Sequence, residues 1–224
     1  MENFFLNYSD TTFPLLAAIL LIVYIRKWQP GAGWLLAYSL VSFLLMGYGN
    51  LLADQGLHNL YIYHLFTMLE AILVLHLINT LSPEKYKYIN VVLSLFLCFT
   101  VLNLIFWEPL FTSFNSNAAG VLNLICTVFC FRYFIRLAKD DNILHFQKLA
   151  GFWIVSGFLF YSVVSVLTLS AYKYRELLPE SDAIISWKIQ QVANMIRFVL
   201  IYVGVIWCYR PDSSSGLYLS DRQR

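Results

Sequence analysis

Long apolar segments separated by short polar breaks dominate this chain of 224 residues. A membrane-crossing helix needs about 20 mostly apolar residues, because each residue rises about 1.5 Å and the hydrocarbon core is about 30 Å thick. Pro and Gly in the breaks, as in Gln29-Pro30-Gly31, are typical helix stops. The sequence predicts an all-α, polytopic seven-transmembrane helix bundle as one domain over residues 1–210, with a polar tail at 211–224. The predicted helices cover about residues 12–25, 33–53, 59–81, 88–107, 117–137, 149–171 and 185–209.

Charged residues are scarce and dispersed. Asp, Glu, Lys and Arg make up 12% of the chain and hydrophobic residues 59%, whereas a soluble domain carries about 25% charged residues. The formal net charge of +2 is small, and the positive residues lie at segment ends rather than in one stripe. This pattern argues against a nucleic-acid partner. It indicates an integral membrane protein whose main partner is the lipid bilayer.

The distribution of Lys and Arg predicts an orientation. One side of the predicted bundle carries Lys173, Arg175 and Lys188. The other side carries Arg26, Lys27, Lys85, Lys87, Arg132, Arg136, Lys139, Lys148, Arg210, Arg222 and Arg224. Because Lys and Arg are enriched in cytoplasmic loops, we expect the N-terminus outside and the C-terminus in the cytoplasm. The expected location is a multi-pass position in a plasma or inner membrane.

Two opposite charges lie in the middle of apolar segments. Glu70 belongs to the segment 59–81 and Arg197 to the segment 185–209. A charged side chain at mid-bilayer costs roughly 2.5–3.5 kcal/mol on insertion scales, so two such residues are expected to compensate each other. Both segments run in the same direction, and each charge lies near mid-depth. The sequence therefore predicts a buried Glu70–Arg197 ion pair.

Each of these charges ends a polar stripe on its helix. His64 and Thr67 precede Glu70 at intervals of three residues, and Gln191 and Asn194 precede Arg197 in the same way. Such spacing places side chains on one helix face. Further polar residues fall in the same half of the other segments: Asn50, Asn103, Asn123, Tyr161, Ser162 and Ser165.

We interpret these stripes as the lining of an outward-facing polar pocket with the ion pair as its floor. The predicted ligand-binding residues are Glu70, Arg197, His64, Thr67, Gln191, Asn194 and Tyr161. The alternative is purely structural. Polar contacts between membrane helices stabilise packing by about 0.6 kcal/mol on average, and a buried ion pair can fix helix register.

The sequence lacks the motifs of retinal proteins, of metal sites and of the common enzyme classes. A retinal protein needs a mid-membrane Lys on its last helix, where this chain has Arg197. The four histidines are scattered over both ends, without metal-ligand spacing, and neither a nucleophile motif nor a phosphate loop is present. We therefore expect no enzyme activity, no cofactor and no metal. The six prolines all fall at segment ends, whereas a transport site usually has Gly- or Pro-interrupted helices.

The sequence favours a receptor-like or sensory membrane protein that binds a small-molecule ligand. Its loops are too short for an output domain, so a cytoplasmic or membrane protein partner would read helix movement through Arg132, Arg136 and Lys139. Two alternatives stay open. One is a small-solute or proton-coupled transporter of three-plus-one-plus-three helix type. The other is a structural subunit of a membrane complex.

Overall fold

The computed structural model describes residues 8–24, 30–140, 145–173 and 180–208, without the side chains of 171–183 and 208. Within these residues it contains seven α-helices, one short 3-10 helix and no strand, which confirms the predicted all-α class. The predicted tail at 211–224 lies outside the described residues. The elements are α2 (Ser9–Val23), α3 (Ala32–Asp54), α4 (Leu60–Leu81), α5 (Ile89–Phe106), α6 (Ser116–Ala138), η2 (Phe146–Lys148), α7 (Ala150–Lys173) and α8 (Glu180–Cys208).

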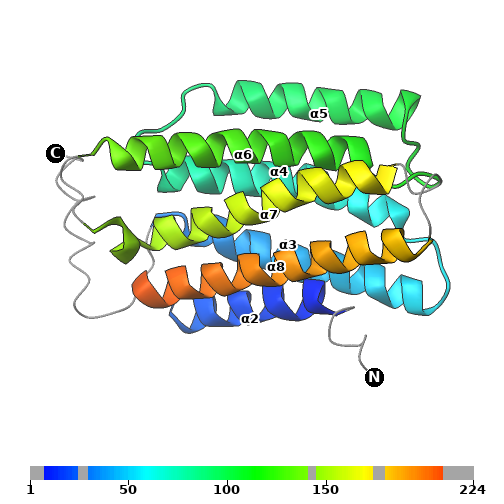
Figure 1. Ribbon diagram of the computed structural model, residues 1–224, viewed down its shortest axis with the longest axis horizontal. Helices are drawn as coiled ribbons and strands as arrows, with labels where there is room; N and C mark the ends of the chain where they lie inside the picture. The colour runs from blue at the N-terminus through cyan, green and yellow to red at the C-terminus, as the bar shows by residue number, and fades with distance from the viewer. Residues whose placement is uncertain (1–7, 25–29, 141–144, 174–179, 209–224) are drawn as a thin grey trace.

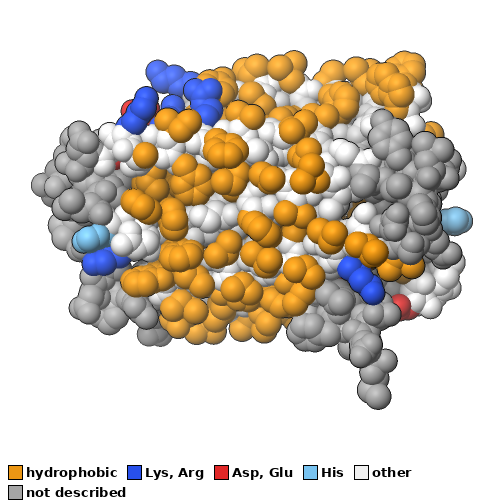
Figure 2. All heavy atoms as spheres, viewed as in Figure 1, with side chains coloured by type: hydrophobic (Ala, Val, Ile, Leu, Met, Phe, Trp, Pro, Cys, Tyr) orange, Lys and Arg blue, Asp and Glu red, His pale blue; other side chains and the backbone are white. Residues whose placement is uncertain are grey.

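Six of these helices, α3 to α8, are long and apolar enough to cross a membrane. Large apolar side chains project outward from them, and Leu95, Ile105 and Leu167 are each at least 65% exposed. Figure 2 shows apolar side chains over the middle of the bundle and Lys and Arg near its ends. Such a surface matches hydrocarbon rather than water. The chain is therefore a multi-pass, all-helical membrane protein.

The first helix differs from the sequence expectation. α2 starts at Ser9 rather than near residue 12, and its 15 residues span about 22 Å, less than the hydrocarbon core. Because it starts earlier, Pro14 lies inside the helix. The prediction that every proline falls at a segment end is therefore wrong for Pro14. Proline has no backbone N–H, so the carbonyl of Asp10, four residues earlier, lacks its usual helical donor.

The helices form a ring with one helix outside it. α2 packs against α3, α3 against α4, α4 against α6, α6 against α7, α7 against α8, and α8 returns to α2. α5 contacts only α4 and α6 among these close neighbours, and it lies at the edge of the bundle in Figure 1. The ring therefore encloses an interior to which α2, α3, α4, α6, α7 and α8 can contribute side chains.

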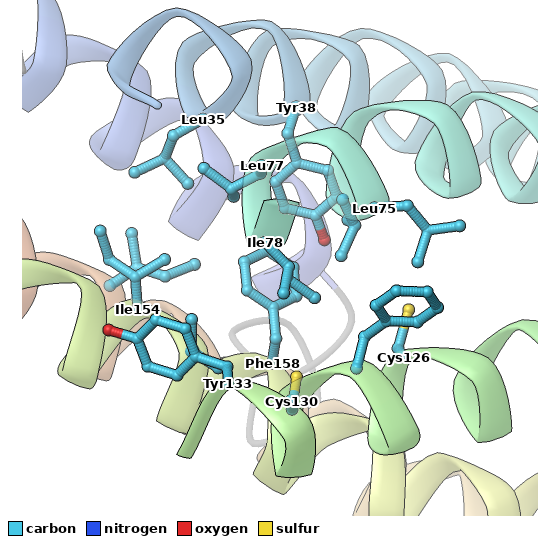
Figure 3. Packing of buried hydrophobic residues seen from close by; sticks show 14 of the residues in the cluster. Leu35, Tyr38, Leu75, Leu77, Ile78, Cys126, Cys130, Tyr133, Ile154 and Phe158 are labelled. Carbon is cyan, nitrogen blue, oxygen red and sulfur yellow. The ribbon is translucent and has the colours of Figure 1, made fainter. Parts of the chain in front are cut away.

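The two halves of this interior differ in character. Beyond Glu70, α4 buries Ala71, Val74, Leu75, Leu77 and Ile78, each at most 1% exposed. Figure 3 shows Leu77 and Ile78 among Leu35, Tyr133, Ile154 and Phe158 from three other helices. α8 continues beyond Arg197 in the same way with Phe198, Ile201 and Val205. The half of the bundle toward the ends of α4 and α8 is thus a packed apolar core.

Candidate functional site

The predicted ion pair lies at the boundary of this apolar core, in the middle of the bundle. The Arg197 Nη1 donates to Glu70 Oε1 at 3.2 Å, and the two side chains are only 4% and 11% exposed. Tyr38 of α3 donates its hydroxyl to the same Glu70 oxygen at 3.2 Å. α4 and α8 supply the two charges and α3 the phenol. The structure confirms the buried Glu70–Arg197 pair.

Aromatic rings surround the Arg197 guanidinium. Its Cζ atom lies 3.7 Å from the centroid of the Tyr161 ring, a distance at which the negative face of an aromatic ring attracts a cation. Three further rings, those of Tyr38, Phe158 and Phe198, have centroids 5.2–5.7 Å away. The guanidinium also donates from Nη2 to Asn194 Oδ1 at 2.5 Å. Four aromatic rings and Asn194 thus surround the Arg197 guanidinium besides Glu70.

A cavity of about 110 Å³ extends from the ion pair toward the end of the bundle where α2, α4, α6 and α8 begin. We call this end the entrance end. One water needs only about 10–15 Å³ of such space, and an apolar cavity of about 150 Å³ holds benzene. The cavity is therefore large enough for several waters or one small molecule. Six of the seven predicted ligand-binding residues line it: Glu70, Arg197, Thr67, Gln191, Asn194 and Tyr161.

The seventh predicted residue, His64, is not among the residues that line the cavity. It is fully buried, and its Nε2 lies 3.1 Å from the Ser113 carbonyl oxygen in the segment between α5 and α6. Three residues turn an α-helix by about 300°, which is about 60° short of a full turn, so His64 and Thr67 point in different directions. This drift turns His64 toward the α5–α6 connection, whereas Thr67 faces the cavity.

Neutral hydrogen bonds fix the polar walls of the cavity. Asn115, just before α6, donates to Thr67 Oγ1 at 2.6 Å. Gln190 of α8 donates to Ser165 Oγ at 2.7 Å, and Gln191 accepts from Ser9 Oγ at 2.9 Å. Three connections thus join α8 to α2, α8 to α7, and α4 to the start of α6. These bonds set the side-chain positions before any ligand binds.

Sequence reasoning missed several residues of this site, and three of them carry or support its polar groups. Asp10 lines the cavity from α2 and is 8% exposed, Asn115 lines it from the segment before α6, and Tyr38 supports Glu70. Asp10 and Asn115 fall outside the predicted helices, where polar residues give no burial signal. Tyr38 carries no pattern that distinguishes it from an interfacial tyrosine.

A second polar cluster explains another predicted interior residue, Asn103. The buried Glu108 carboxylate accepts from Asn103 Nδ2 at 2.8 Å, from Ser116 Oγ at 2.5 Å and from the Asn117 backbone N–H at 2.9 Å. Asn117 also donates to Asn103 Oδ1 at 3.1 Å. Glu108 therefore caps the first turn of α6, where unpaired N–H groups favour a negative charge. Asn103 belongs to this cap rather than to the cavity.

The basic end of α6 has partners within the chain. The Cζ atom of Arg136 lies 4.2 Å from the centroid of the Tyr86 ring, and that of Arg132 lies 5.5 Å from the Tyr88 centroid. Arg136 also pairs with the Glu84 carboxylate at 3.5 Å. These contacts fix the α4–α5 connection against α6.

Comparisons with known proteins give no relative. A scan against protein-family models, a search of curated proteins and a search of solved structures each found no match. The functional argument therefore depends on the site itself.

The site brings charged, polar and aromatic side chains together around one cavity. Among the described residues, no group of three His, Cys, Asp or Glu side chains lies close enough to hold a metal ion. The cavity combines two carboxylates, one guanidinium, amides and aromatic rings. Mostly apolar walls with a few fixed polar groups are typical of small-molecule sites.

Proposed function

We propose that this chain is a receptor-like or sensory membrane protein that binds a small molecule in the cavity above Glu70 and Arg197. The observation that carries the proposal is the position of the ion pair, between the cavity and a packed apolar core. A pair that served packing alone would need no adjoining space of about 110 Å³. We propose no enzyme activity and no cofactor.

In the proposed topology all seven helices cross the membrane, and the bilayer thins locally around the short helix α2. The protein lies in a plasma or inner membrane with its N-terminus outside and its C-terminus in the cytoplasm, and the entrance end faces outward. The excess of Lys and Arg at the other end supports this orientation. The cavity would then be open to extracellular or periplasmic solutes.

Signal transfer would use α8. The helix carries Gln191, Asn194 and Arg197 in the cavity, and it packs closely against α7 along its length. Built-on Cβ atoms at Gly157 and Gly204 would lie 2.7 and 2.9 Å from backbone carbonyl oxygens of the neighbouring helix. Because these helices touch at their backbones, a shift of α8 at the ligand would move α7 as well. A protein partner at the opposite end could read this movement.

A transporter of three-plus-one-plus-three helix type is the second candidate. The ring supports this architecture. The first three helices, α2 to α4, and the last three, α6 to α8, meet at two junctions, where α4 packs onto α6 and α8 packs onto α2, and α5 lies outside the ring. Pro14 also interrupts the hydrogen bonding of α2 at the cavity, a feature that transport sites often have. The apolar core below Glu70 argues for the receptor, since the side chains there leave Leu75, Leu77 and Ile78 with no exposed surface. A structural subunit would need neither feature.

Ligand binding can be tested with a matched pair of variants in lipid nanodiscs. Ala119 lines the cavity, so Ala119→Leu fills it, whereas a side chain at the adjacent Gly120 meets no atom within 4 Å. Melting temperatures are measured with a panel of amines, amino acids, carboxylic acids and sugars. We expect at least one compound to raise the melting temperature of the parent and of Gly120→Leu, but not of Ala119→Leu. Stabilisation of all three proteins alike would contradict binding in this cavity.

Two further measurements separate the functions. Uptake of the stabilising compound into proteoliposomes would assign the transporter. No uptake, together with a ligand-dependent distance change between spin labels at Ala138 of α6 and Ile206 of α8, would assign the receptor. Both positions are exposed at the end opposite the entrance. If the small neutral reagent methyl methanethiosulfonate cannot modify an Ala119→Cys variant, the cavity is closed and both assignments fail.

A further inference from the structure

The charges that line the cavity do not balance. Among the described residues, its lining includes two carboxylates, Asp10 and Glu70, but only one basic side chain, Arg197. Glu70 and Arg197 neutralise each other at the floor. Asp10 therefore leaves one negative charge at the entrance end of the cavity.

Asp10 is held by neutral groups. Its Oδ1 accepts from Asn50 Nδ2 at 3.0 Å and from Thr11 Oγ1 at 3.4 Å. The ion pairs of the described residues are Arg136–Glu84 and Arg197–Glu70, so no basic side chain there pairs with Asp10. A carboxylate that is 8% exposed is expensive without a positive partner. The position of Asp10 at the start of α2 provides only part of this compensation.

Two other features of the cavity lining suit a cation. The carbonyl of Asp10 has no donor from Pro14, which also lines the cavity. The aromatic rings of Tyr63, Phe66 and Trp187 are part of the lining as well, and aromatic faces bind ammonium groups through their quadrupoles. A carboxylate, a carbonyl and aromatic rings together recognise organic ammonium ions better than hard metal ions, which prefer an all-oxygen shell.

Asp10 at the entrance end and Arg197 at the floor lie at different depths in the cavity. Gln191 accepts from Ser9, the neighbour of Asp10, and Arg197 follows Gln191 by six residues of α8, about 9 Å along the helix. Asp10 can therefore pair with a ligand while Arg197 stays paired with Glu70.

We propose that the cavity binds a small organic cation, a primary or methylated ammonium ion, with Asp10 as its counter-ion and the aromatic rings around it. The inference rests on the proposed function, because it names the ligand class of the same cavity. It requires that the cavity favour positive over negative solutes of equal size, and that Asp10 cause most of this preference.

Charge-selective labelling of one cysteine tests this requirement. The four native cysteines are replaced by alanine and Ala119→Cys is introduced in the cavity wall. Labelling rates are then measured in phosphatidylcholine nanodiscs with three methanethiosulfonate reagents, which carry a trimethylammonium, a sulfonate or a methyl group. Each rate is divided by that of the same reagent with free 2-mercaptoethanol. We expect the normalised rate of the cationic reagent to exceed that of the anionic reagent about tenfold or more, the effect of a focused negative potential.

Asp10→Asn should reduce this ratio several-fold without changing the rate of the methyl reagent, because Asn keeps an oxygen acceptor for Asn50 and Thr11. Asp54→Asn is the matched control. Asp54 is an exposed acid at the same end that accepts from Tyr8 at 2.5 Å and does not line the cavity, so its loss should leave the ratio within about twofold.

Protection of the introduced cysteine by a bound cation provides the second readout. Tetramethylammonium chloride should slow the methyl reagent at Ala119→Cys, whereas sodium chloride of equal ionic strength should not. Equal protection by sodium would reassign the site to an inorganic cation and overturn the proposal. A ratio near one, or one that Asp10→Asn leaves unchanged, would overturn it while keeping the cavity. Failure of all three reagents to react would instead overturn the proposed function.

Discussion

Removal of either member of the Glu70–Arg197 pair should destabilise the fold by several kcal/mol. At 3.2 Å and an effective dielectric constant of about 20, two unit charges attract each other by about 5 kcal/mol. Glu70→Gln keeps an oxygen near Arg197 but removes the charge, and Arg197→Gln leaves the Glu70 carboxylate with Tyr38 as its donor. Breaking a buried pair by removing one partner typically costs about 3–5 kcal/mol, and we expect this range for each variant.

The aromatic cage sets what a charge swap can restore. Exchanging the residues, Glu70→Arg with Arg197→Glu, returns opposite charges to the interior. However, it moves the guanidinium to α4, away from the Tyr161 ring that lies 3.7 Å from Cζ in the parent. A desolvated cation–π contact contributes up to about 2 kcal/mol. The swapped protein should therefore regain about half of the loss and remain roughly 2 kcal/mol less stable than the parent.

The assay is reversible SDS unfolding in bicelles, with the two Gln variants, their double variant and the swap. If the pair interacts directly, the double variant should lose about 2–3 kcal/mol less than the sum of the single losses. Lys148→Gln in η2 is the surface control and should stay within about 0.5 kcal/mol of the parent. Single variants as stable as this control, or losses that add fully, would refute the reasoning.

Three other predictions concern packing, capping and topology. Gly157→Ala places a Cβ 2.7 Å from the Arg197 carbonyl oxygen and should lower stability by about 1–3 kcal/mol in the same unfolding assay, whereas Gly120→Ala, which meets open space, should not. Glu108→Ala removes the acceptor of Ser116 and of the Asn117 N–H and should cost about 1–3 kcal/mol by thermal unfolding, against at most about 1 kcal/mol for Glu84→Ala at the exposed pair with Arg136. Green fluorescent protein fused after Arg224 should fluoresce and alkaline phosphatase there should stay inactive in a bacterial host, and the reverse pattern would overturn the proposed orientation.

Much of the architecture could be predicted from the sequence, because hydrocarbon imposes a strong rule on single segments. Each helix must satisfy its own backbone, and each buried charge needs compensation. Apolar length alone thus predicted helices over the segments where the structure places α3 to α8. The cost of a charge in lipid likewise predicted that Glu70 and Arg197 meet. The helix starts were predicted less well, because α2 starts three residues and α8 five residues before the predicted position, in polar sequence that gives no apolar length signal.

The composition of the site depended on tertiary structure, because helix rotation and neighbours are set by packing between segments distant in the chain. Three-residue spacing placed Thr67 at the cavity but could not show that His64 turns to Ser113. Nor could it show that Tyr161 covers the guanidinium or that α2 brings Asp10 to the entrance. The sequence by itself determined which groups must be buried and compensated. Only the folded ring of helices decided which side chains compensate them and where space remains for a ligand.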